Sequence, residues 1–138
     1  MKKLDFIVFT PEGKKYEEKC DLVQVHGDKY FLGISAGQSL LISDVIVSKL
    51  IITNDGVSTP CAVGNGVLSV ENDTLKLMVN SFEKVNEIDL KRAQESKRRA
   101  EERLKNLENS VDIIRAKASL ERALNRINIV SNDNIWFM

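Results

Sequence analysis

The chain has 138 residues, of which 43% are hydrophobic and 29% charged, a balance typical of folded globular proteins and not of disordered ones. Its 20 basic and 20 acidic residues cancel, so no net field attracts the whole molecule to nucleic acid or to a membrane. No apolar run approaches the roughly 20 residues of a membrane span, and Asp5 and Pro11 interrupt the apolar stretch that a signal peptide needs. We therefore expect a soluble cytosolic protein. Cys20 and Cys61 are then expected to be buried reduced thiols, with a disulfide as the alternative.

The N-terminal part has the signals of short β-strands. All seven glycines and both prolines lie in the first 66 residues, and apolar residues there alternate with polar ones between turn signals. The clearest case is a predicted hairpin within 62–80, whose turn is Glu71-Asn72-Asp73. This spacing of strands and turns predicts an antiparallel sandwich or barrel. The predicted strands lie within residues 3–10, 20–28, 29–35, 39–53 and 62–80.

From Ile88 onward the period becomes that of α-helices. Apolar or small residues recur three and four positions apart in two series, joined by a turn at 108–112, which predicts an antiparallel helical hairpin. Alanines in both series allow close approach but bury little apolar area, so we expect a marginally stable, mobile hairpin. The fold class is therefore α+β: a β-sandwich over 1–84, then a two-helix hairpin over 85–138. The two series are Leu90, Ala93, Lys97, Ala100, Leu104, Leu107 and Ile113, Ala116, Leu120, Ala123, Ile127, Val130.

The hairpin is also rich in arginine. Residues 1–87 contain 9 basic and 12 acidic residues, whereas 88–130 contain 11 basic and 7 acidic ones. Two arginine series share one spacing, and the antiparallel arrangement predicts that Arg92 lies near Arg122 and Arg126, at the helix start marked by Asp89. Guanidinium groups and the free N–H groups of a helix N-terminus suit phosphate oxygens. The two series are Arg92, Arg99, Arg103 and Arg115, Arg122, Arg126.

The same pattern also fits a simpler interpretation. Arginine-rich helix faces are usually solvated and paired within the helix, for example Glu95 with Arg99, and Asp89 alone is explained as a first-turn charge that complements the helix dipole. No catalytic set or metal site can be assembled. The only histidine, His26, is expected to be a surface or hydrogen-bonded residue, and the glycine-rich segment 64–69 lacks the lysine of a phosphate-binding loop.

Four stretches carry a resemblance to a known family. Together with the order of the two parts, they resemble the epsilon subunit of bacterial F-type ATP synthases over nearly the whole chain. The last stretch matches that family's ATP-binding signature, Ile or Leu, Asp, two variable residues, Arg and Ala, at every fixed position. The stretches are FTPEGKKYEEKCDLVQVHG (9–27), GISAGQSLL (33–41), GNGVLSVENDTLKLMVNSFE (64–83) and IDLKRA (88–93).

The resemblance implies a non-catalytic subunit of the central stalk, a rotor in ATP synthesis coupled to ion transport. The sandwich would bind the gamma subunit and touch the c-ring, with neither membrane insertion nor nucleic-acid binding, at the cytoplasmic face of the bacterial cell membrane. The hairpin would be contracted, or extended so that basic residues meet an acidic loop of the beta subunit and oppose ATP hydrolysis. Those residues would be Arg103, Arg115, Arg122 and Arg126.

In family members that bind ATP, the nucleotide holds the contracted state. Carried over to this chain, Glu83 and Asp89 would approach the adenine, Ile88 and Ala93 complete the motif, and Ala93 leaves room beside the base. ATP would be a regulatory ligand and not a catalytic cofactor, with the role of magnesium open. The alternative is a constitutive assembly subunit whose hairpin does not bind ATP. The phosphates would be bound by Arg92, Arg122 and Arg126, with Arg99 as a further contributor.

Two features depart from the family. Where it often has Gly-Ile-Leu-Pro-Gly-His-x-Pro-Leu, this chain has Ser35-Ala36 for Leu-Pro, Gln38 for His and Ser39 for the second Pro. The loop lacks proline, and we expect it to be less rigid. The aromatic pair Trp136-Phe137 near the end is unusual as well, and we expect it to be a packing anchor, with a partner contact as the alternative.

Overall fold

The computed structural model describes residues 2–106 and 110–131. The chain divides into two compact units, Met1–Val85 and Asn86–Met138. The predicted aromatic anchor Trp136-Phe137 and the seam residue Leu107 lie outside the described residues.

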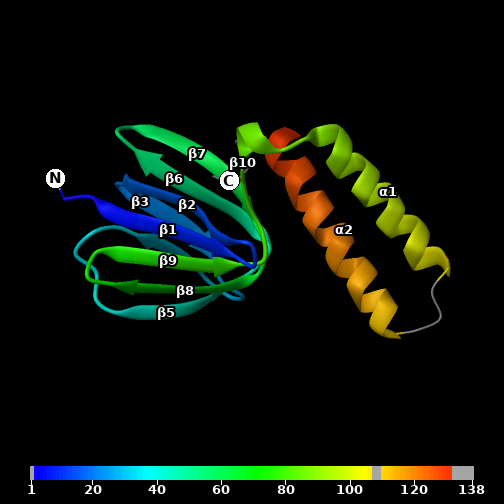
Figure 1. Cartoon of the computed structure of the whole chain (residues 1–138), viewed down its shortest axis with the longest axis horizontal. Helices are drawn as coiled ribbons and strands as arrows, with labels where there is room; N and C mark the ends of the chain where they lie inside the picture. The colour runs from blue at the N-terminus through cyan, green and yellow to red at the C-terminus, as the bar shows by residue number, and fades with distance from the viewer. Residues whose placement is uncertain (1, 107–109, 132–138) are drawn as a thin grey trace. The chain divides into compact units, whose positions relative to one another are not determined.

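The first unit is a sandwich of two five-stranded sheets (Figure 1), as predicted. One sheet has the order β2-β1-β9-β8-β5 and the other β10-β7-β6-β3-β4. Neighbouring strands are antiparallel, except that β1 and β9 run parallel. The strands are β1 (Leu4–Thr10), β2 (Gly13–Cys20), β3 (Leu22–His26), β4 (Phe31–Ile34), β5 (Leu41–Val45), β6 (Ser48–Asn54), β7 (Val57–Val63), β8 (Gly66–Glu71), β9 (Thr74–Val79) and β10 (Phe82–Lys84).

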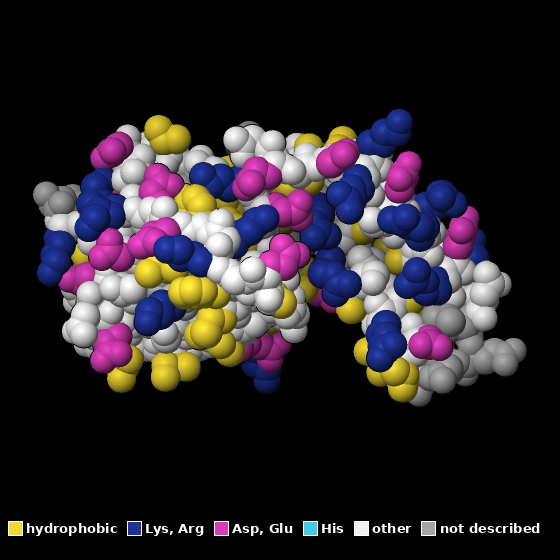
Figure 2. All heavy atoms as spheres, in the orientation of Figure 1, with side chains coloured by type: hydrophobic (Ala, Val, Ile, Leu, Met, Phe, Trp, Pro, Cys, Tyr) yellow, Lys and Arg dark blue, Asp and Glu magenta, His cyan; other side chains and the backbone are white. Residues whose placement is uncertain are grey.

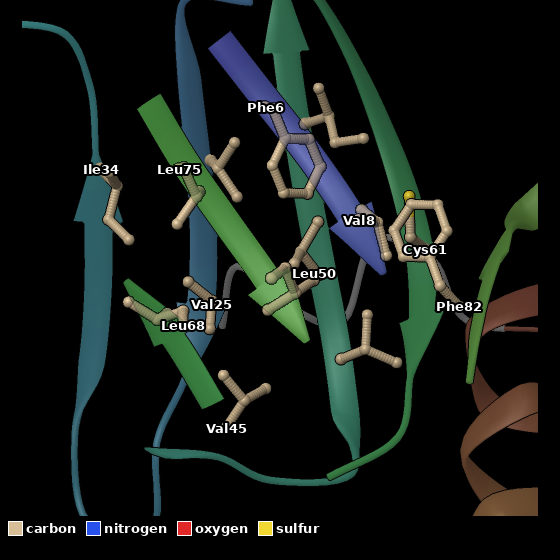
Figure 3. Packing of buried hydrophobic residues seen from close by; sticks show 14 of the residues in the cluster. Phe6, Val8, Val25, Ile34, Val45, Leu50, Cys61, Leu68, Leu75 and Phe82 are labelled. Atoms are coloured by element: carbon tan, nitrogen blue, oxygen red, sulfur yellow. The ribbon is translucent and has the colours of Figure 1, made fainter. Parts of the chain in front are cut away.

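The core lies between the sheets and follows the alternation of each strand. In the predicted hairpin, Leu68 stands opposite Leu77, and both are fully buried. Figure 3 shows Phe6 of one sheet and Leu50 of the other among the side chains that fill the same interior. Side chains at every second position therefore bury apolar area, which is the main stabilising term of such a sandwich.

The family resemblance implies ten strands, but the residue pattern does not locate three of them. In β2 only Cys20 is buried and most other residues are exposed, because this strand forms the edge of its sheet. Its polar sequence, GKKYEEKC, therefore has no alternating apolar signal. Strands β7 and β10 were also missed: β7 contains Pro60, and β10 has three residues. The glycine-rich segment 64–69 is not a phosphate loop, since it leads into β8, where a Cβ on Gly66 would lie 2.0 Å from the carbonyl oxygen of Met78.

The second unit contains α1 (Leu90–Asn106) and α2 (Ser110–Ser131), which pack side by side in opposite directions (Figure 1). A short 3-10 helix, η1 (Val85–Glu87), precedes α1. The predicted turn at 108–112 is too long, because α2 already begins at Ser110. The seam is confirmed at its small positions, which are almost completely buried, while Lys97 is half-buried. The buried seam residues are Ala93, Ala100, Ala116 and Ala123.

The cysteines, the apolar character of the helices and the potential metal ligands can be examined across both units. Cys20 and Cys61 are both buried thiols, and burial raises the pKa of the Cys20 thiol to about 11, which keeps it protonated and unreactive at neutral pH. Within residues 2–106 and 110–131, no helix has the length and apolar character to cross a membrane. The same residues contain no group of three or more potential metal ligands.

His26 makes the stability of the sandwich depend on pH. Its ring lies 5.1 Å from that of Phe31, centroid to centroid, and burial lowers its pKa below the ordinary 6.5. The folded protein therefore favours neutral imidazole, so stability is full above pH 6.5 and is lost as pH falls below that value. We expect the free energy of unfolding, measured with urea, to decrease from pH 7.5 to 5.5 and to decrease less in His26→Gln. An equal decrease in both proteins would contradict this assignment.

Candidate functional site

Asp89 forms the N-cap of α1. Its Oδ1 accepts a hydrogen bond from the backbone N–H of Arg92 at 3.1 Å, and its carbonyl oxygen accepts one from Ala93 N–H at 3.0 Å. A helix begins with unpaired N–H groups, and an aspartate at this position satisfies one of them. The segment IDLKRA therefore begins α1 by a side-chain cap, with Arg92 and Ala93 in its first turn. Ala93 is 4% exposed and faces the seam.

The cap predicts how two substitutions at Asp89 differ. Asp89→Ala removes the acceptor for the Arg92 amide and is expected to destabilise the hairpin by about 1 kcal/mol. Asp89→Asn retains a side-chain oxygen, and asparagine caps helices about as well as aspartate. Thermal unfolding followed by circular dichroism at 222 nm should therefore show an earlier loss of helicity in Asp89→Ala than in Asp89→Asn. Similar losses in both variants would show that the charge matters here and the cap does not.

The spacing of six arginines along α1 and α2 puts them on one side of an antiparallel helix pair. On each helix, a row of residues flanks the buried seam: positions 96 and 103 on α1, and positions 119 and 126 on α2. In an antiparallel helix pair these two rows lie on the same side of the seam. The other four arginines are three or four residues away from a position in one of these rows, so they lie on that side as well. Figure 2 shows lysine and arginine side chains gathered over the helical unit. We call this set the arginine flank: Arg92, Arg99, Arg103, Arg115, Arg122 and Arg126.

Two guanidinium groups of the arginine flank are held by serines of their own helices. Arg99 donates to Ser96 Oγ at 3.3 Å, and Arg122 donates to Ser119 Oγ at 3.2 Å. Because α1 and α2 run in opposite directions, the Arg122 side chain reaches away from the end of the hairpin that contains Arg92. The Arg122 guanidinium is thus turned toward the middle of the hairpin, and the predicted proximity of Arg92 to Arg122 and Arg126 stays a prediction. Arg92 is exposed, while Arg122 and Arg126 are half-buried.

The other predicted site residues, Glu83 and Ile88, lie before the start of α1. Glu83 lies in β10 opposite Ala62, in the sandwich unit, and is half-buried. Ile88, between η1 and α1, is half-buried as well. In place of the predicted contact of Glu95 with Arg99, the ion pair found on this helix is Arg98 with Glu102, at 2.8 Å. Arg98 lies outside the arginine flank.

A second surface was missed by the sequence reasoning. Exposed apolar side chains lie together on the outer face of the β1-β9-β8-β5 sheet, over β8 and β5 in Figure 2. Val67 and Met78 stand directly opposite each other on neighbouring strands, at 45% and 43% exposure, and Ile42 on β5 is 72% exposed. A signal was present, because these residues occupy the outward positions of strands whose inward positions are also apolar. We call the set Leu40, Ile42, Val67 and Met78 the apolar patch.

Comparison with family models covers the two units separately. Residues 3–85 match the model described as "ATP synthase, Delta/Epsilon chain, beta-sandwich domain". Residues 86–131 match the model described as "ATP synthase, Delta/Epsilon chain, long alpha-helix domain".

Curated relatives and solved structures agree with these matches. The chain is 35% identical over 129 residues to the ATP synthase epsilon chain of Bacillus mycoides, covering 94% of this chain and 97% of the relative. It is 35% identical over 132 residues to that of Staphylococcus saprophyticus, covering 95% and 98%. The fold is similar to a chain in the Euglena gracilis mitochondrial ATP synthase (TM-score 0.73, 12% identity, 89% and 78% covered). It is also similar to a chain in the Tetrahymena thermophila central stalk and c-ring (TM-score 0.60, 15% identity, 94% and 98% covered).

Proposed function

Because the chain belongs to the delta/epsilon family of ATP synthase subunits, as the epsilon chain, we propose that its helical hairpin restrains ATP hydrolysis and responds to the level of ATP. The protein itself carries out no catalysis in this proposal. Its supporting observation is the arginine flank, which lies beside an α1 that begins with IDLKRA and is capped by Asp89. Six guanidinium groups on one side of a hairpin attract phosphate and can donate charge-assisted hydrogen bonds to its oxygens.

The regulation rests on a difference in affinity between two hairpin states. ATP binds arginines of both helices in the contracted state, and separation of the helices in the extended state removes that binding site. A ligand shifts such an equilibrium only by its differential affinity. At free ATP 100 times its dissociation constant the contracted state gains about 2.7 kcal/mol. When ATP falls, the basic side of the hairpin becomes available to acidic residues of the beta subunit.

The sandwich supplies the attachment to the rotor. We assign the apolar patch to the gamma subunit, because an exposed apolar sheet face of this kind is typical of a protein interface. The turns at the end of the sandwich that carries the N-terminus would face the c-ring. The subunit is then a peripheral component at the cytoplasmic face of the membrane.

Calorimetric titration of the whole chain with ATP tests the regulatory part. Saturable one-to-one binding that prefers ATP over ADP and GTP is the expected result. Absence of heat up to millimolar ATP would instead favour the alternative, a constitutive assembly subunit in which the arginine flank serves only the beta subunit. The family assignment does not depend on this outcome.

A further inference from the structure

The loop between β4 and β5 is fastened by a side chain from a distant turn. Asp73, in the turn between β8 and β9, accepts a hydrogen bond from the backbone N–H of Gly37 on Oδ1 at 2.6 Å. Its other oxygen, Oδ2, pairs with Lys2 Nζ at 2.6 Å. Within the loop, Gln38 Oε1 accepts a hydrogen bond from Ser35 N–H at 2.8 Å. One carboxylate thus joins the N-terminal segment, the β8–β9 turn and the loop.

The neighbouring lysine makes the corresponding contact in the other sheet. Lys3 Nζ lies 2.7 Å from Asp21 Oδ1 and 2.8 Å from Asp55 Oδ1, in the turn between β6 and β7. Successive residues of an extended segment point to opposite sides, so Lys2 and Lys3 reach one turn of each sheet. Both turns lie at the end of the sandwich that carries the N-terminus (Figure 1). Lys2 and Lys3 therefore connect the N-terminal segment to carboxylates of both sheets at this end.

The loop depends on these contacts because its own backbone is permissive. Gly37 has a φ of +89°, a conformation that glycine adopts without strain, and a Cβ added to it would meet no atom within 4 Å. The chain has no proline between residues 33 and 41 to restrict it. The loop leads directly into Leu40, which is 66% exposed and belongs to the apolar patch. The conformation of the loop therefore decides where one side of the apolar patch lies.

We propose that Asp73 is a positioning residue for partner binding, which holds the 35–40 loop and Leu40 in the conformation that docks on the gamma–c-ring stalk. The inference rests on the proposed attachment of the sandwich to that stalk. Without Asp73 the loop has to be ordered when the complex forms, and the cost of that ordering lowers affinity. Lys2 and the Gly37 amide also hold the pKa of Asp73 below the ordinary 3.8. The contact is therefore complete above that pH and is lost only as pH falls through the lowered pKa.

The turn itself offers a matched pair of variants. Asn72 and Asp73 both have a positive φ, 52° and 59°, which glycine adopts without strain. Asp73→Gly keeps the turn and removes the contacts to Gly37 and Lys2, whereas Asn72→Gly keeps the turn and both contacts. Asp73→Asn retains an oxygen for the Gly37 amide and removes the charge that pairs with Lys2. Each full-length variant is tested for amide hydrogen exchange at Gly37 and for binding to a detergent-solubilised gamma–c-ring complex lacking this subunit.

We expect Asp73→Gly to lose protection of the Gly37 amide and to bind the complex about fivefold to tenfold more weakly. Asn72→Gly should match the wild type in both measurements, and Asp73→Asn should retain most of the affinity. If Asp73→Gly loses amide protection but binds as tightly as Asn72→Gly, the positioning role is wrong and the proposed function stands. If the wild type does not bind the complex, the proposed attachment fails and this inference with it.

Discussion

Replacing Ile42 and Val67 together by aspartate is expected to weaken binding of the chain to the gamma subunit by about 100-fold or more. Ile42 is 72% exposed and Val67 45%, so in the free subunit both new carboxylates remain in water. In an interface centred on the apolar patch they would be removed from water without a partner. Pull-down and surface plasmon resonance with the gamma–c-ring complex measure the loss.

The control for this prediction lies in the other sheet. Val57, at the start of β7, is 65% exposed and outside the apolar patch, and Val57→Asp introduces one carboxylate on the same scaffold. Because Val57 follows the β6–β7 turn, at the end assigned to the c-ring, Val57→Asp is compared with each single variant, Ile42→Asp and Val67→Asp, for binding to the isolated gamma subunit. Val67 stands directly opposite Asp44 on β5, so Val67→Asp creates a pair of like charges that lowers stability. Thermal unfolding is therefore measured for every variant, and binding is compared at a temperature at which all of them are folded. Normal binding by the Ile42→Asp, Val67→Asp double variant, or equal loss in Val57→Asp, would show that the gamma subunit does not use the apolar patch.

Arg92→Ala and Arg126→Ala are each expected to weaken ATP binding by about 10- to 100-fold. Each variant removes a charge-assisted hydrogen bond to phosphate, which contributes about 1.5–3 kcal/mol. Both residues stand at the end of the hairpin where α1 begins and α2 ends. Since the ligand stabilises the contracted state, Arg92→Ala should also increase inhibition of hydrolysis by the assembled complex at a given ATP concentration. Arg126→Ala should increase it less, because Arg126 is also expected to contact the acidic loop of the beta subunit.

Arg98→Ala is the matched control for these arginines. It removes the same charge from α1, but Arg98 pairs with Glu102 at 2.8 Å and lies outside the arginine flank. Calorimetry should therefore give an affinity close to that of the wild type. If Arg98→Ala weakens binding as much as Arg92→Ala, the attraction is a general effect of net charge and no specific phosphate site exists.

Asp89 belongs to a nucleotide-binding motif in the sequence and forms a helix cap in the structure. The IDLKRA segment pointed to a nucleotide, yet in the structure the Asp89 side chain caps α1 through the Arg92 amide. Both roles fit the same residue, because a carboxylate at a helix N-terminus has two oxygens and uses one of them for the cap. The comparison of Asp89→Asn with Asp89→Ala in ATP titration separates these roles, since only the asparagine variant retains the cap.

The period of apolar residues along the chain was sufficient to predict a β-sandwich followed by a helical hairpin. The alternation around Leu68 and Leu77 predicted the β8–β9 hairpin, and the three-four spacing of apolar or small residues predicted which side of each helix is buried. These signals are local, because burial of one face imposes a period of about 2 or 3.6 on the residues of that element. Strand β2 lacked the signal, since an edge strand with both faces largely in water needs no apolar alternation.

Contacts between residues far apart in sequence required the folded structure. Val67 and Met78 become one surface with Ile42 only because β8 lies between β9 and β5 in the sheet. Asp73 reaches Gly37 across 36 positions of sequence, and Lys2 reaches Asp73 across a still longer interval. The Arg122 guanidinium turns toward Ser119, a choice of rotamer that spacing along the helix does not specify. The order of the strands, the conformation of the loop and the direction of a side chain depend on packing between elements. Whether a segment is a helix or a strand is determined by the residues of that segment.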